Sequence, residues 1–159
     1  LTHELHQLGG VVQVAAGAFP AEGQVAAQSQ HMVDAVVQIV LQAIRAAGIT
    51  MPVDVGIMPI LDQAATINMA LSRNGCVMPR ALCEIISKNW IFPNPFDKEP
   101  FDADVAGKKE SFRKAGIEYT INQIDEYRAC GVDGIHLYAL NKYDDVAYIA
   151  KAAGLLDLI

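Results

Sequence analysis

Three short clusters of residues could contact a ligand, and each follows a segment with the pattern of a buried strand. The clusters are Ala18–Pro20, Met58–Gln63 and Tyr138–Lys142. In proteins built from alternating strands and helices, ligands bind at the carboxyl ends of the parallel strands. We therefore expect any binding site of this chain to be formed by these clusters.

The third cluster contains the most informative side chains. Because side chains alternate along a strand, His136 and Tyr138 share one face, and Ile135 and Leu137 face the other way toward covering helices. A histidine and a phenol in the interior need hydrogen bonds or a ligand. For His136 we favour a hydrogen-bonded core position, whereas for Tyr138 a ligand contact and a structural position remain equally open. Lys142 could hold a carboxylate or phosphate, or could be a solvated loop lysine.

The elements that position these clusters follow from hydrophobic periodicity and from helix caps. β-branched apolar residues predict strands, three- and four-residue apolar spacings predict helices, and glycine ends several of them. We expect strands over 11–16, 52–59 and 134–140, and helices over 24–47, from the cap Asp62 to Arg73, from Pro79 to about Asn89, through Ile117, Ile121, Ile124 and Tyr127 to Gly131, and from a cap at Asp144 or Asp145 to Gly154. The proline- and phenylalanine-rich segment 90–104 should be an ordered loop packed on the domain.

Alternating strands and helices predict an α/β fold with parallel strands. A (β/α)₈ TIM barrel needs about 250 residues, and the chain has 159 and begins with Leu1. We therefore interpret residues 1–159 as a single partial barrel domain, the carboxyl-terminal half of a larger catalytic domain.

Composition limits the partners and the compartment. The formal net charge of −6 argues against binding to nucleic acid or to an anionic membrane surface. No apolar run approaches the 20 residues of a spanning helix. Three widely spaced cysteines, Cys76, Cys83 and Cys130, favour buried free thiols in a reducing cytoplasm over disulfides or a zinc site. We expect a cytoplasmic protein without a metal.

Several segments together resemble the methylenetetrahydrofolate reductase family. The segment 116–142, with the motif Gly131-Val132-Asp133-Gly134 leading into His136-Leu137-Tyr138, is similar to the closing helix and last strand of that family. Residues 47–60, which end in Gly56-Ile57-Met58-Pro59-Ile60, resemble its seventh strand, and residues 14–20 resemble its fifth. The segments occur in the family's order and cover most of the chain.

This resemblance implies a (β/α)₈ barrel that binds FAD and passes a hydride from NAD(P)H to 5,10-methylenetetrahydrofolate, in one-carbon metabolism and methionine biosynthesis. Phe19 takes the place of a flavin-contacting aromatic, and Pro20 and His31 join it as candidate cofactor-binding residues, although residue types alone place His31 in a polar, solvent-facing stripe. Tyr138, Lys142 and Gln63 are the candidate folate-binding residues. Lys142 stands where many members carry arginine, and Gln63 where an aromatic often stacks.

The chain also departs from the family pattern. The family's sixth strand is missing near Asp34-Ala35-Val36, so the long helix is interpreted as two helices joined where a strand has been lost. By this resemblance we expect the amino-terminal half of the family's barrel, with the catalytic acid, to lie outside the chain, so no catalytic residue is assigned. We expect the chain alone to be inactive, and the full-length parent to be a homo-oligomer. The alternatives are another folate- or pterin-handling barrel enzyme and a degenerate, non-catalytic oligomerisation module.

Overall fold

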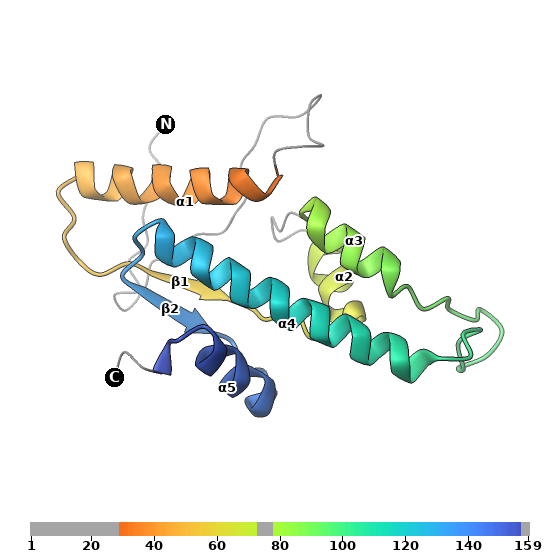
Figure 1. Ribbon diagram of the computed structural model, residues 1–159. Coiled ribbons are helices and arrows are strands. Elements are labelled where there is room, and N and C mark those ends of the chain that lie inside the picture. Colours follow the sequence, from red (N-terminus) through yellow and green to blue (C-terminus); the bar gives the residue numbers. More distant parts are fainter. Residues whose placement is uncertain (1–28, 73–77, 157–159) are drawn as a thin grey trace, which may run out of the picture.

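The computed structural model describes residues 29–72 and 78–156 (Figure 1). Side chains of the first helix are described from residue 36 onward. The described elements are α1 (Ser29–Ala46), β1 (Asp54–Ile57), α2 (Gln63–Leu71), α3 (Arg80–Lys88), α4 (Val105–Ala129), β2 (Gly134–Leu137) and α5 (Tyr143–Ala152). The predicted strand 11–16 lies outside these residues.

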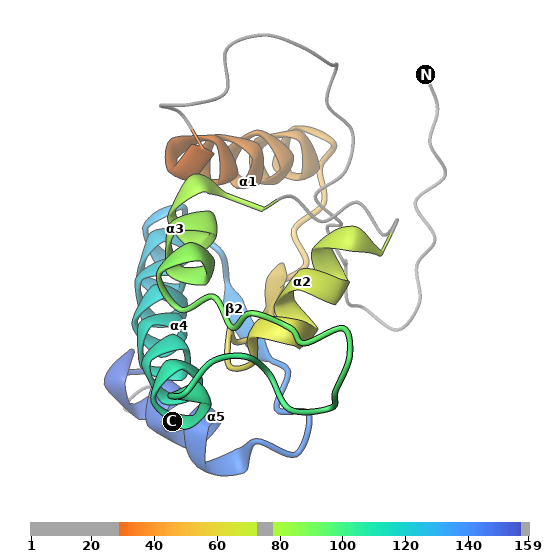
Figure 2. The ribbon, with the colours of Figure 1, turned by 90° about the vertical axis from the view of Figure 1, so that its right-hand side faces the viewer.

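The two strands form a parallel pair in which Asp54 is opposite Gly134 and Ile57 is opposite Leu137. Figure 2 shows α4 and α5 on the same side of this pair. The apolar side chains of both strands face those helices, where they pack with Ile117, Ile124, Tyr127 and Ile149 in one core cluster. The prediction that Ile135 and Leu137 face the helices is therefore confirmed.

The long helix α4 runs alongside the strands and contacts α1, α3 and α5 (Figure 1). Its amino end is capped by Asp104, whose carboxylate accepts a hydrogen bond of 2.9 Å from the Gly107 N–H. Its carboxyl end is followed by Gly131 at φ +83°, a left-handed conformation that favours glycine. The predicted apolar face is confirmed, since Ile117, Ile124 and Tyr127 are all buried.

Helix α1 runs without interruption through residues 34–36, so no break in the helix marks the expected junction of two helices. It ends before Gly48, at φ +79°. Its last turn is joined to the amino ends of the strands by Asp133, whose carboxylate accepts hydrogen bonds from Val53 N–H at 2.8 Å and from Arg45 Nη2 at 2.6 Å. These bonds lower the pKa of Asp133. The ionised Asp133 carboxylate thus links the amino end of β1 to the end of α1, at the end of the sheet opposite the predicted binding clusters.

Two predicted boundaries were wrong near the carboxyl end. Strand β2 ends at Leu137 and not at residue 140, because Leu140 and Asn141 have positive φ angles and turn the chain. Helix α5 begins at Tyr143 after Lys142, and not at a cap formed by Asp144 or Asp145. Both acidic residues lie in its first turn, where their negative charge interacts favourably with the helix dipole.

The segment 90–104 contains no helix or strand, as predicted, and is braced by Lys108. The expectation that it packs on the domain was wrong for Phe92, Phe96 and Phe101, whose side chains are exposed. The Lys108 ammonium donates to the Trp90 carbonyl at 2.8 Å, pairs with the Asp102 carboxylate and lies 5.6 Å from the centre of the Phe92 ring. Asp102 also accepts from the Phe92 N–H at 2.6 Å. The hydrogen bond from Lys108, together with this one, lowers the pKa of Asp102.

The expectation of buried thiols was wrong for Cys83, which is exposed on α3, while Cys130 is half-buried after α4. Cys76 lies outside the described residues. Among the helices that the structure describes, none is both long and apolar enough to cross a membrane. The α/β architecture with parallel strands is confirmed, but two described strands do not outline a barrel.

Candidate functional site

The carboxyl ends of β1 and β2 bring two of the three predicted clusters together. Ile57 and Leu137 are paired at the ends of the strands, and the Tyr138 N–H donates to the Ile57 carbonyl at 3.0 Å. Residues 58–63 and 138–142 therefore leave the sheet side by side. The remaining cluster, Ala18–Pro20 with Phe19, lies outside the described residues, as does the side chain of His31 in the first turn of α1.

The loop after β1 is fixed by close contact with the backbone of α4. Thr120 is completely buried, and its Oγ1 accepts from the Ile60 N–H at 3.2 Å while donating to the Gly116 carbonyl at 2.7 Å. A Cβ atom on Gly116 would overlap the Ile60 carbonyl oxygen and lie 2.9 Å from its carbon. Gly116 and Thr120 therefore set where the loop leaves the strand.

Gln63 lies at the start of α2, directly after the cap residue Asp62, whose carboxylate accepts from Ala65 N–H at 2.8 Å. The Gln63 Nε2 group donates to the carbonyls of Ile86 at 3.2 Å and Asn89 at 3.0 Å, at the end of α3. Its amide nitrogen thus joins two helices. Its Oε1 atom receives no hydrogen bond from the described residues and is the end that a ligand donor could meet.

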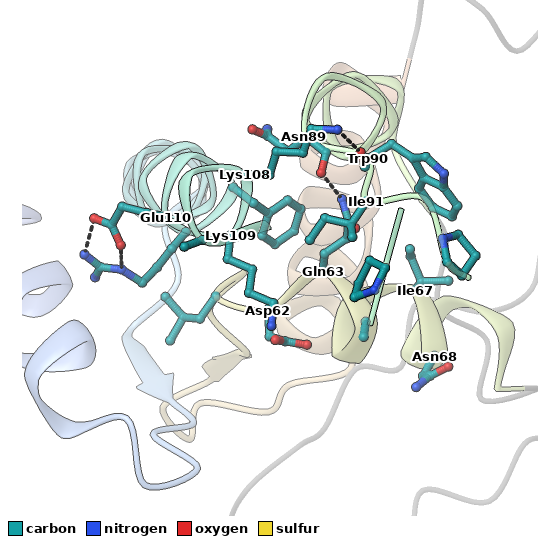
Figure 3. A pocket seen from close by; sticks show the side chains of 17 residues that line it. Asp62, Gln63, Ile67, Asn68, Asn89, Trp90, Ile91, Lys108, Lys109 and Glu110 are labelled. Atoms are coloured by element: carbon teal, nitrogen blue, oxygen red, sulfur yellow. Dashed lines mark hydrogen bonds and ion pairs between the residues drawn. The ribbon is translucent and has the colours of Figure 1, made fainter. Parts of the chain in front are cut away.

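Gln63 also lines a pocket of about 700 Å³ between α2, the loop 90–104 and the start of α4 (Figure 3). Its walls are largely apolar, with Ile67, Trp90, Ile91, Pro93, Pro100 and Phe112 among them. A mostly apolar pocket with a few fixed polar groups is the usual form of a small-molecule site. Gln63, one of the predicted folate-binding residues, therefore lies at the edge of a pocket of the kind that binds small molecules.

The charged groups of this pocket are mostly paired. Glu110 accepts from the Arg113 guanidinium at 2.9 Å, which lowers the pKa of the Glu110 carboxyl. Lys108 is paired with Asp102, and Arg113 also pairs with Asp145. Lys109 forms no ion pair with any described residue. It therefore remains the available cation of the pocket lining.

The face of the strand pair away from the helices carries Tyr138, His136 and Gly56. The Tyr138 and His136 rings meet edge to face, with centroids 4.6 Å apart and planes at 77°. Gly56 is directly opposite His136 in the register. The prediction that His136 is a core histidine was wrong: it is exposed, because no described element covers this face.

The cluster 138–142 holds two residues in uncommon backbone conformations. Leu140 has φ +43° and Asn141 has φ +64°, and the Lys142 N–H closes the turn on the Ala139 carbonyl at 2.7 Å. Such strain in a non-glycine residue is common at ligand sites and is held by the surrounding structure. Lys142 is exposed and forms no ion pair within the described part of the chain, so its charge is available.

Three residues that shape this site were missed from the sequence: Gly56, Gly116 and Thr120. A glycine inside a strand signals close approach by another group, and Gly56 could have been found in this way. A glycine in a helix centre carries a similar signal, since it costs stability unless space requires it. Thr120 gives no such signal, because only the fold brings it to Ile60.

A sequence model of the family described as methylenetetrahydrofolate reductase matches residues 12–154. No curated protein sequence matches the chain. The match covers both strands, the pocket and every described helix, and extends into residues that precede α1. The chain therefore belongs to the methylenetetrahydrofolate reductase family.

Proposed function

We propose that this chain is the carboxyl-terminal part of a flavin-dependent methylenetetrahydrofolate reductase and supplies the folate side of its site. The observation that carries the proposal is the family match over residues 12–154, combined with the meeting of Tyr138 and the loop before Gln63 at one edge of the sheet. The overall reaction is reduction of 5,10-methylenetetrahydrofolate to 5-methyltetrahydrofolate with NAD(P)H as donor, in cytoplasmic one-carbon metabolism.

Each proposed folate contact has a distinct physical task. Tyr138 offers a ring and a phenol on the open face of the sheet, where a flat ligand ring can pack. Gln63 offers Oε1 as an acceptor for a ligand N–H, since its nitrogen is already used. Lys142 offers an exposed positive charge for a carboxylate of the substrate. Lysine cannot form the bidentate hydrogen bonds that arginine forms with a carboxylate, so the position of the bound carboxylate should be less fixed.

FAD is the cofactor that the family implies, and it would supply the hydride transfer when bound. The described residues do not by themselves fit a flavin. They form one wall, a strand pair with one open face, while Phe19 and Pro20 lie outside the described residues. We therefore derive no reaction step through the flavin and propose that the chain alone neither retains FAD nor turns over.

The test is to purify the chain after adding excess FAD and to record the visible spectrum, followed by an assay of NAD(P)H oxidation. We expect no flavin absorbance after gel filtration and no turnover. A stoichiometric bound flavin would overturn the proposal for the isolated chain. The elution volume from the same column also shows whether the chain forms oligomers. Oligomers are expected both if the parent protein is a homo-oligomer and if the chain is a non-catalytic oligomerisation module.

A further inference from the structure

Two glycines on the open face of the strand pair lie under side chains of the neighbouring strand. A Cβ atom on Gly56 would meet the Tyr138 ring, at 2.9 Å from Cε2 and 3.1 Å from the phenol oxygen. A Cβ atom on Gly134 would overlap the Asp54 carboxylate. Each glycine leaves the space that one side chain of the other strand occupies.

The backbone does not require glycine at either position. Within the described residues, glycines with positive φ are Gly48, Gly131 and Gly154, so Gly56 and Gly134 have conformations that other residues adopt. A glycine inside a strand costs stability relative to alanine. The value of Gly56 must therefore come from the space above it, which the Tyr138 ring fills.

We propose that Gly56 is a positioning residue for Tyr138. The absence of a Cβ lets the Tyr138 ring reach over β1 at Gly56, and the His136 and Tyr138 rings meet edge to face with centroids 4.6 Å apart. Together they fix the ring plane and the place of the phenol oxygen over Gly56. This inference rests on the proposed function. The folate then packs on the Tyr138 ring where the ring covers β1, and not beyond the carboxyl end of β2.

The first experiment needs no ligand. Tyrosine labelled with ¹³C in the ring gives signals for the five tyrosines of the chain, and Tyr138→Phe identifies one of them. In the wild-type chain we expect a nuclear Overhauser contact between the Tyr138 ring and the Gly56 Hα protons. Gly56→Ala should shift the Tyr138 signals and leave the other four unchanged.

The matched control is Gly134→Ala, a glycine on the same face whose neighbour is Asp54 and not the ring. It should leave the Tyr138 signals in place. Equal shifts in both variants, or no shift in Gly56→Ala, would overturn the inference. If Gly56→Ala fails to fold, absence of the Overhauser contact in the wild-type chain is still decisive against it.

The second experiment connects the ring to the ligand. Tetrahydrofolate binding is measured by calorimetry for wild type, Gly56→Ala, Tyr138→Ala and the double variant. We expect Gly56→Ala to weaken binding about tenfold, or roughly 1.4 kcal/mol, and to have no further effect once Tyr138 is removed. Additive losses would contradict a role through Tyr138. Absence of binding by the wild type would count against the proposed function, while the ring signals still decide the role of Gly56.

Discussion

The close approach of Gly116 to Ile60 predicts that alanine at position 116 destabilises the protein, although alanine usually stabilises a helix relative to glycine. An alanine in a helix centre normally stabilises by about 0.5–1 kcal/mol relative to glycine. In Gly116→Ala the new methyl group would overlap a backbone carbonyl oxygen, which cannot rotate away as a side chain can. Overpacking typically costs about 1–3 kcal/mol, and a shift of the loop would also weaken the bond from Ile60 N–H to Thr120, worth about 1 kcal/mol.

We therefore expect Gly116→Ala to lower the free energy of unfolding by about 2 kcal/mol. For a domain of this size the midpoint temperature should fall by about 6 °C. Urea unfolding followed by circular dichroism measures the change. Ser111→Ala, an exposed position on the same helix, is the control and should stay within about 0.5 kcal/mol of wild type. A Gly116→Ala protein as stable as wild type would refute the reasoning.

The remaining predictions concern three polar side chains. Thr120→Val keeps the shape of this buried side chain but leaves the half-buried Ile60 N–H without its acceptor, so urea unfolding should show a loss of about 1–3 kcal/mol. Gln63→Leu removes the bonds to the end of α3 and should lower stability by about 1 kcal/mol as well as weaken folate binding; unchanged stability would contradict the tether. Asp133 has a lowered pKa in the folded chain, so its contribution is present above the unfolded value near 3.9 and is lost as pH falls below it. Asp133→Asn should therefore reduce the acid-induced loss of stability in unfolding curves from pH 6 to 3, and an identical pH profile would contradict this role.

The sequence predicted those features that depend on neighbours in the chain. Capping by Asp62, the stop at Gly131 and the helix-facing side of β2 follow from local residue types and periodicity. Two boundaries failed where local cues competed. Acidic residues of the first turn of α5 resembled a cap, and an apolar run past Leu137 resembled more strand than the positive φ angles at residues 140 and 141 allow.

Features that depend on residues far apart in sequence were not predictable in the same way. Thr120 meets Ile60 across 60 residues, and the Gln63 amide reaches the end of α3 across 23 and 26 residues. Likewise, the exposure of His136 depends on what covers the open face of the sheet, and periodicity alone cannot show that. The types of the candidate site residues were predicted, whereas the contacts that hold them came only from the fold.

The central claim is that the chain presents a folate-binding wall built around Tyr138. Its most direct test is calorimetric titration of the purified chain with tetrahydrofolate, comparing wild type with Tyr138→Ala and with Tyr148→Ala, an exposed tyrosine on α5. We predict saturable binding by wild type and by Tyr148→Ala, and binding at least tenfold weaker for Tyr138→Ala, a difference of about 1.4 kcal/mol. Wild-type binding that is absent, or that survives Tyr138→Ala unchanged, would contradict the claim.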